Sequence, residues 1–287
     1  MLLIAGIIPH GDVPLITGKV EKNGHFLSIQ HYDIPTAQGT AAMISAALAL
    51  TEYLQIEPPR VVLAGDTGRG EGSRRVYEYL IDNVMELSPD VLALHYWMPD
   101  LELMHQLYEK VQMLNPRPVL IADAASMYAA KAAGLAAGFD VFTPDLSEIA
   151  FLADPEAIHP AYIDKHLFQS CNSSTVPALI EKAYRSHGAS KYLLVKGKSD
   201  FIADENGVMA VIDEPDVPEL ECIGGTGDTI TGMCAGLISK GLDTKQALLL
   251  SARANRLAGM VDTTTPATSI EEIITRFPEV FKNHLDI

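Results

Sequence analysis

The stretch of this sequence with the clearest capacity for chemistry is a glycine-rich turn followed by a carboxylate. Residues 223–232 read IGGTGDTITG. Glycines let the backbone adopt positive φ and approach a ligand closely, and a helix that begins there directs unpaired N–H groups at an anion. We therefore predict an anion hole suited to phosphate, with a general base beside it. The anion hole would consist of Gly225, Thr226 and Gly227, and the base would be Asp228.

The charge of the chain excludes two classes of partner. The 287 residues include 37 acidic and 21 basic side chains, which gives a formal net charge of −16. Such a surface repels nucleic acid and anionic membranes, so we expect neither as a partner. It does not exclude a nucleotide, because a local anion hole can outweigh a diffuse field. The expected partners are a nucleotide and a small-molecule substrate.

The cysteines and the apolar runs indicate the compartment. Cys171, Cys222 and Cys234 lie far apart without a C-x-x-C pair, which argues against a disulfide framework or a zinc site. The apolar run from Leu2 to Ile8 lacks a basic flank, so we interpret it as a buried strand and not as a signal peptide. No apolar run approaches the roughly 20 residues of a membrane helix. We therefore expect a cytoplasmic protein.

Short apolar runs alternate with helical patterns along most of the chain. This alternation predicts a three-layer α/β fold, in which helices cover both faces of a mainly parallel sheet. Asn23-Gly24 is a hairpin signal, so we expect a small β flap or lid at about residues 12–36, within a single domain of residues 1–287. The runs expected as parallel strands are residues 2–8, 61–64, 91–94, 119–122, 141–142 and 192–195.

Polar residues follow several of these strands, where ligands bind in open α/β sheets. Asp123, Asp145 and Lys196 hold such positions. We expect Asp145 and Lys196 to meet Asp228 at one crevice, together with Glu148. Local roles are the alternatives: Asp123 and Asp145 would cap helices, and Glu148 would interact with a helix dipole.

The segment His95-Tyr96-Trp97 also ends a predicted strand. One interpretation places these side chains in the floor of the crevice. The other is a buried aromatic cluster at the edge of the sheet, which is the commoner arrangement.

Two further glycines lie within the helix that follows the glycine turn. Gly232 and Gly236 are one turn apart, and each costs about 1 kcal/mol relative to alanine in a helix. Their presence indicates that a ligand or another backbone approaches this helix closely.

Four stretches, taken in order, resemble the ribokinase-like superfamily. The first is Gly39-Thr40, which opens an alanine-rich helix. Residues 61–80, with the loop Gly65-Asp66-Thr67-Gly68, resemble the family's strand, glycine loop and helix. Thr143-Pro144-Asp145 with Glu148 is similar to its T-P-N-x-x-E segment, and residues 225–228 are similar to its G-A-G-D signature. The resemblance covers nearly the whole chain.

This resemblance implies an ATP- and Mg²⁺-dependent kinase that phosphorylates a hydroxyl group of a small metabolite, such as a sugar. Asp228 would accept the hydroxyl proton, and the anion hole would hold the transferred phosphoryl group. ATP or ADP would be the nucleotide, and a homodimer is expected by analogy. The resemblance places Mg²⁺ at Asp145 and Glu148, the nucleotide at Lys196, Gly197 and Asn255, and the substrate at Asp12, Gly39, Thr40 and Asp66.

Two departures leave a second reaction open. Asp145 stands where the family usually has asparagine, and alanines follow Thr40 instead of the sugar-kinase pattern. Residues 224–232 and the pair Lys196-Gly197 are similar to another branch, the ATP- or ADP-dependent NAD(P)H-hydrate dehydratases, although the N-terminal third lacks that branch's usual opening. A non-catalytic nucleotide-binding protein is the third possibility, and the kinase is our main prediction.

Overall fold

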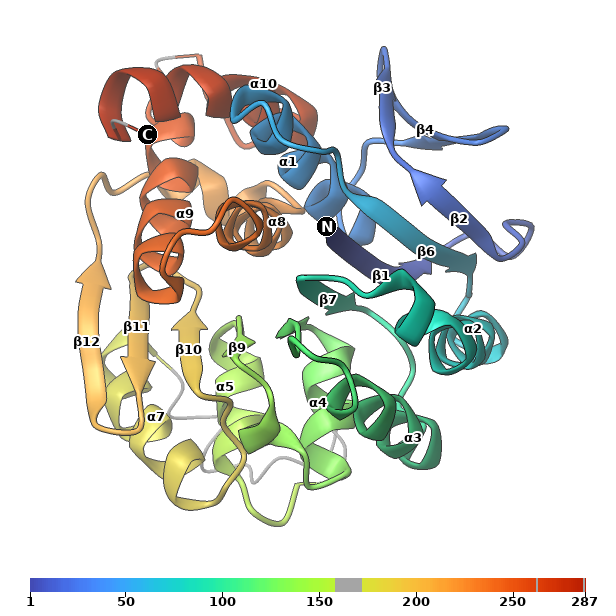
Figure 1. Ribbon diagram of the computed structural model, residues 1–287. Coiled ribbons are helices and arrows are strands. Elements are labelled where there is room, and N and C mark those ends of the chain that lie inside the picture. Colours follow the sequence, from blue (N-terminus) through green and yellow to red (C-terminus); the bar gives the residue numbers. More distant parts are fainter. Residues whose placement is uncertain (158–171, 262, 286) are drawn as a thin grey trace.

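A nine-stranded sheet forms the centre of the computed structural model, which describes residues 1–157, 172–261, 263–285 and 287 (Figure 1). The strand order is β12-β11-β10-β9-β8-β7-β1-β6-β2. The six strands from β10 to β6 are parallel, and β2, β11 and β12 are antiparallel to their neighbours. The strands are β1 (Leu2–Ile8), β2 (Ile16–Lys19), β6 (Arg60–Gly65), β7 (Val91–His95), β8 (Val119–Asp123), β9 (Val141–Phe142), β10 (Tyr192–Val195), β11 (Asp200–Asp204) and β12 (Gly207–Ile212).

Helices cover both faces of this sheet, which confirms the expected three-layer α/β fold (Figure 1). One layer contains α1 (Thr40–Tyr53), α8 (Thr226–Ser239), α9 (Thr244–Gly259) and α10 (Ile270–Val280). The other contains α2 (Glu71–Leu87), α3 (Leu101–Gln112), α4 (Ala125–Ala132), α5 (Leu146–Ala153) and α7 (Val176–Arg185). Short helical turns occur at Ala136–Gly138, Ser173–Thr175, Pro218–Cys222 and Phe281–Leu285.

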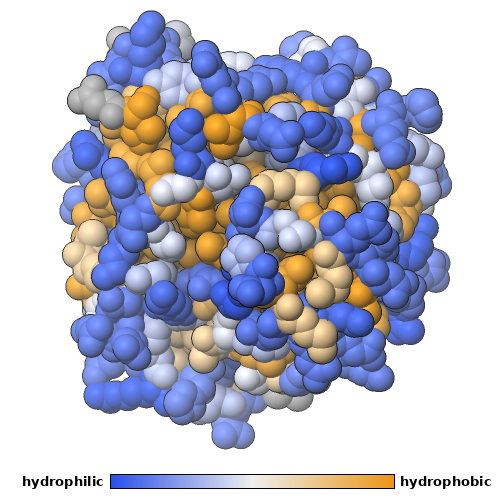
Figure 2. Space-filling view, in the orientation of Figure 1, coloured by the Kyte–Doolittle hydropathy of each residue, from blue (hydrophilic) through white to orange (hydrophobic). Residues whose placement is uncertain are grey.

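The central strands are apolar except at their ends, where Arg60, His95 and Asp123 lie, because both of their faces are buried. Along β1, Leu2 and Ile4 pack in one hydrophobic cluster, whereas Leu3 and Ala5 pack in the other. Successive side chains of a strand point to opposite faces, so a continuous apolar run is what a doubly covered sheet requires. Hydrophilic residues cover most of the molecular face seen in Figure 2, with apolar residues visible in its central part. Among the described residues, no helix has the length and apolar character needed to cross a bilayer.

A separate three-stranded sheet lies within the predicted flap. It consists of β3 (Glu21–Asn23), β4 (Phe26–Ile29) and β5 (Tyr32–Pro35), with the expected hairpin turn between β3 and β4. Leu27, Ile29 and Ile34 anchor it in the same hydrophobic cluster as α1. The earlier part of residues 12–36 does not belong to this small sheet, since β2 pairs with β6 at the edge of the main sheet.

Helices α1 and α8 approach closely through small residues. A Cβ atom added at Gly232 would lie 2.1 Å from the Met43 carbonyl oxygen of α1, and one at Gly236 would lie 3.2 Å from Leu50 Cδ2. The approach predicted from these two glycines is therefore that of a neighbouring helix. It brings the first turns of α1 and α8 together.

The different neighbours of these glycines give a stability prediction. We expect Gly232→Ala to lower the free energy of unfolding by about 1–3 kcal/mol, because the new methyl group meets a backbone carbonyl that cannot move alone. Gly236→Ala is the matched control, since Leu50 can adjust its side chain and alanine favours the helix. Urea unfolding of both variants is the measurement. Equal losses of unfolding free energy in the two variants would contradict the close contact between position 232 and the Met43 carbonyl group.

Candidate active site

A cavity of about 870 Å³ lies at the carboxyl ends of the parallel strands. Its lining combines residues that follow β7, β8, β9 and β10 with the first turn of α8. This is the position in which open α/β sheets bind ligands. The candidate residues from the sequence that line it are Asp123, Asp145, Glu148, Lys196, Gly197, Thr226, Gly227, Asp228 and Asn255.

The glycine turn ends at the N-terminus of α8, as predicted. Gly225 is the N-cap residue with a φ of 103°, in the left-handed region that favours glycine. A Cβ atom at Gly224 would lie 2.2 Å from Gln38 Oε1, so the turn also packs tightly against the segment before α1. Thr226 Oγ1 donates hydrogen bonds to the carbonyl oxygens of Leu220 and Ile223, which fixes the turn from the other side.

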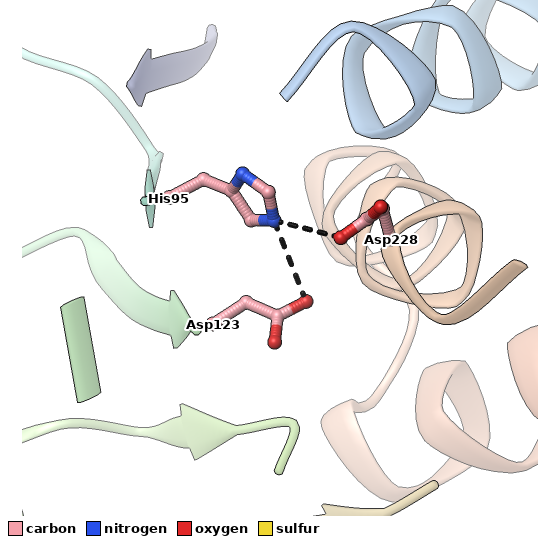
Figure 3. A group of neighbouring side chains, drawn as sticks. All are labelled: His95, Asp123 and Asp228. Atoms are coloured by element: carbon pink, nitrogen blue, oxygen red, sulfur yellow. Dashed lines mark hydrogen bonds and ion pairs between the residues drawn. The ribbon is translucent and has the colours of Figure 1, made fainter. Parts of the chain in front are cut away.

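Asp228 is held by two donors from distant parts of the chain. The Gly39 N–H donates to Asp228 Oδ2 at 2.7 Å, and His95 Nε2 lies 3.0 Å from Asp228 Oδ1 (Figure 3). Burial alone would raise the pKa of Asp228. The interactions with His95, followed by the charge of Lys196 and the hydrogen bond from Gly39, outweigh it and hold the pKa below its ordinary value. Asp228 is therefore an ionised, oriented acceptor at neutral pH.

Lys196 and Asp123 form a buried ion pair beside the turn. Lys196 Nζ lies 2.8 and 2.9 Å from the two carboxylate oxygens of Asp123, and Thr231 Oγ1 donates to the same carboxylate at 2.5 Å. Burial would lower the pKa of Lys196, but the charges of Asp123, Glu148 and Asp228 raise it above the ordinary value. A fixed positive charge thus lies against Gly227, where a Cβ atom would be 3.5 Å from Nζ.

His95, Asp123 and Asp228 form the cluster drawn in Figure 3, and one ligand atom from each lies within 4.8 Å of the others. These residue types can bind a metal ion. However, His95 Nε2 is already hydrogen-bonded to Asp228, and the Lys196 ammonium group occupies both oxygens of Asp123. The cluster is therefore a hydrogen-bonded network in which Lys196 supplies the positive charge.

Asp145 and Glu148 form a capping box at the start of α5. Asp145 Oδ1 accepts the Glu148 N–H at 2.8 Å, and Glu148 Oε2 accepts the Asp145 N–H at 2.8 Å. Burial, followed by the negative charges of Asp145 and Asp123, raises the pKa of Glu148 to about 8. The local capping role considered from the sequence is thus present, and both side chains also line the cavity.

The remaining candidate substrate residues lie outside the cavity lining. Asp12 is exposed, while Gly39 and Thr40 act on the network through Asp228 and His95. Asp66 is buried, and its carboxylate accepts the N–H groups of the glycine loop and of Ser73. Burial would raise the pKa of Asp66, but these hydrogen bonds hold it below the usual 3.8. The structure thus supports a structural role for Asp66.

Both interpretations of residues 95–97 describe part of that segment. His95 and Trp97 are fully buried, whereas Tyr96 has 46% exposure and lines the cavity with a φ of 63°. Burial and the charges of Asp228, Glu148 and Asp123 raise the pKa of Tyr96 to about 12, so its phenol is neutral.

The site also contains residues that sequence reasoning missed. Thr231 is three residues after Asp228 on α8, and this helical spacing was the signal that could have identified it. Arg256 donates to Asp200 at 2.8 Å and to the carbonyl oxygens of Gly197 and Lys198, which fixes the loop after β10. No local sequence pattern indicates these contacts of Arg256.

The fold is that of the ribokinase-like superfamily. A mutant of phosphofructokinase-2 from Escherichia coli is similar, with a TM-score of 0.57 and 16% identity over 98% of this chain and 99% of that chain. The pyridoxal kinase from Staphylococcus aureus, solved with AMP-PCP and pyridoxal, has a TM-score of 0.54 and 13% identity over 91% of each chain. These identities are low, so the likeness establishes the fold alone.

Sequence relatives define the family within this fold. The family model described as NAD(P)H-hydrate dehydratase matches residues 90–277, and the chain belongs to this family. An uncharacterized protein of Methanocaldococcus jannaschii is 39% identical over 85% of this chain and 100% of its own length.

Two relatives with named activities match shorter parts. The ADP-dependent (S)-NAD(P)H-hydrate dehydratase of Nitrosopumilus maritimus is 35% identical over 29% of this chain and 27% of its own. The bifunctional NAD(P)H-hydrate repair enzyme of Pyrobaculum aerophilum is 26% identical over 61% of this chain and 32% of its own. The matches thus span about a third or less of these relatives' lengths.

The family match corrects our main functional prediction. The expected sugar kinase, a phosphotransferase, is wrong, and the alternative dehydratase interpretation fits the family model and the named relatives better. The physical reason for the error is that the glycine turn and Asp228 are features of the fold. They do not identify the fate of the hydroxyl group.

The buried ion pair gives the first prediction for the site. Lys196→Met leaves the Asp123 carboxylate buried without its cation, so we expect a loss of about 3–5 kcal/mol in the free energy of unfolding. The double variant Asp123→Asn/Lys196→Met should recover most of this loss, because the unpaired charge is removed as well. Urea unfolding followed by the fluorescence of Trp97, the one tryptophan in the sequence, measures both. A double variant that loses as much free energy of unfolding as the two single variants together would contradict the pairing.

Asp66 gives a pH-dependent prediction. We expect Asp66→Asn to cost about 1–3 kcal/mol at pH 7, because an amide cannot accept all the hydrogen bonds that the carboxylate accepts. The pKa is lowered in the folded state, so the contribution is present above pH 3.8 and is lost as the pH falls through the folded-state pKa. Urea unfolding between pH 3 and pH 7 should therefore show the two proteins converging at low pH. Asp82→Asn, on the exposed face of α2, is the control and should show no such convergence.

Proposed function

We propose that this protein is a nucleotide-dependent NAD(P)H-hydrate dehydratase. One observation carries the proposal: the ionised Asp228, held at the N-terminus of α8 beside Lys196, lies within the residues that the dehydratase family model matches. The cavity supports it further, because a carboxylate acceptor, a fixed cation and a helix N-terminus line the same space. These groups suit the removal of a hydroxyl proton next to a phosphate.

The chemistry follows from the poor leaving ability of hydroxide. Transfer of the terminal phosphoryl group of the nucleotide to the hydroxyl of the hydrated ring forms a new O–P bond and breaks the bond to the nucleotide's bridging oxygen. Asp228 accepts the hydroxyl proton in this step. Departure of phosphate then breaks the C–O bond, and loss of a proton from the adjacent carbon restores the double bond. The products are NAD(P)H, inorganic phosphate and the nucleotide shortened by one phosphate.

The proposed nucleotide is ADP or ATP, since relatives of this chain are named for ADP dependence. Lys196, Gly197 and Asn255 line the cavity and would bind it. The oxygen ligands of Asp145 and Glu148 suit Mg²⁺. Burial, followed by the negative charges of Asp145 and Asp123, raises the pKa of Glu148, and a bound cation would offset those charges. When bound there, Mg²⁺ would neutralise the phosphate charge.

Replacing the proposed base tests the assignment. We expect Asp228→Asn to lower kcat by about 10²–10⁴-fold, because asparagine cannot accept the hydroxyl proton. Recovery of NADH absorbance from hydrated NADH with ADP or ATP measures turnover, and equilibrium titration with each nucleotide should show retained binding. Asp82→Asn is the matched control and should keep wild-type activity.

Two results would contradict the proposal. One is an Asp228→Asn variant with unchanged turnover. The other is a wild-type protein that recovers no NADH with either nucleotide in the presence of Mg²⁺.

A further inference from the structure

We propose that His95 and Thr40 are positioning residues, which fix the Asp228 carboxylate through a chain of two hydrogen bonds. Thr40 Oγ1 lies 2.9 Å from His95 Nδ1, and His95 Nε2 lies 3.0 Å from Asp228 Oδ1. The catalytic part of this inference rests on the proposed function, whereas the arrangement of the protons does not.

The chain connects three elements that are distant in sequence. Thr40 is the first residue of α1, His95 is the last residue of β7, and Asp228 lies in the first turn of α8. His95 has 0% exposure and is not among the residues lining the cavity, so it acts on the substrate only through Asp228. Thr40 has 3% exposure. In such a buried setting, solvent offers no easy replacement for a lost donor.

The hydrogen-bonding partners determine the tautomer of His95. An ionised carboxylate only accepts hydrogen bonds, so His95 Nε2 must carry the hydrogen that faces Asp228. In the chain that we propose, Nδ1 carries no hydrogen and accepts the hydrogen bond that the Thr40 hydroxyl donates across the 2.9 Å contact. Threonine is therefore the group that favours the Nε2–H form.

Gly6 of β1 allows this arrangement. A Cβ atom at position 6 would lie 2.7 Å from Thr40 Cγ2, 3.0 Å from Thr40 Oγ1 and 2.8 Å from the His95 carbonyl oxygen. The backbone of β1 therefore packs directly on both positioning residues. The Thr40 side chain therefore has little space in which to adopt another orientation, and the backbone of His95 is held beside it.

Both oxygens of the Asp228 carboxylate accept hydrogen bonds in this arrangement. Gly39 N–H binds Oδ2 and His95 binds Oδ1, so these two donors fix the orientation of a carboxylate that also lines the cavity. The other charged or titratable groups around it are Lys196 after β10, Asp123 of β8, Tyr96 after β7 and Glu148 of α5. The donation from His95 favours the ionised form against the nearby negative charges.

A matched pair of substitutions separates the two hydrogen bonds of the imidazole. The amide of His95→Gln can reach the position of Nε2 and keep the donation to Asp228. The amide of His95→Asn can reach only the position of Nδ1 and keeps the contact with Thr40. We expect His95→Asn to move the acid limb of kcat/KM to higher pH by about one unit, and His95→Gln to keep the wild-type limb. The KM for the nucleotide should change in neither variant.

Thr40 provides a second pair. Thr40→Val removes only the hydroxyl donor and should shift the acid limb in the same direction by a smaller amount. Thr40→Ser keeps the donor and should restore the wild-type profile. A purely structural role for the hydroxyl would change stability in Thr40→Val without moving the pH profile.

NMR tests the inference without turnover. In ¹⁵N-histidine-labelled protein, the signal lost in His95→Gln identifies His95, and we expect a protonated Nε2 with an unprotonated Nδ1. In ¹³C-carboxyl-labelled protein, the pKa of Asp228 should rise in His95→Asn. An Nδ1–H tautomer, or an Asp228 pKa unchanged in His95→Asn, would overturn the inference. Absence of dehydratase activity with the expected NMR results would overturn the proposed function alone.

Discussion

The fixed orientation of the Asp228 carboxylate is the constraint that links the other parts of the site. Its two oxygens accept hydrogen bonds from the segment before α1 and from the end of β7, and its backbone belongs to α8. Helices α1 and α8 can hold this geometry because Gly232 allows their backbones to touch. The packing of the core and the geometry of the acceptor are thus parts of one arrangement.

Positive charge at the cavity is fixed in the same way. Lys196 is paired with Asp123, and Arg256 is paired with Asp200 and with two carbonyl groups of the loop after β10. In a chain with a net charge of −16, mobile surface cations would do little to attract a phosphate. Buried partners keep both cations at defined positions in the lining of the cavity. Lys196 lies against Gly227 in the first turn of α8, where the helix N-terminus adds its own positive potential.

Much of the fold and part of the site could be predicted because they depend on local chemistry. Continuous apolar runs identified the strands, and the glycine turn identified the start of α8, with Asp228 in its first turn. Thr143 to Glu148 was recognisable as a site segment, although its immediate structural role is the capping box. The reaction could not be predicted from the turn, because phosphoryl transfer to a hydroxyl is compatible with either a kinase or a dehydratase.

The local sequence determines the α/β order, the start of α8 at the glycine turn and the position of Asp228 on that helix. Helix starts and buried strands depend on neighbouring residues. The partners of the charged groups, in contrast, depend on the folded chain. His95 and Asp228 are separated by 133 residues, and Asp123 and Lys196 by 73. A hydrogen bond requires contact within about 3 Å, and no local pattern encodes which distant side chains the sheet brings that close.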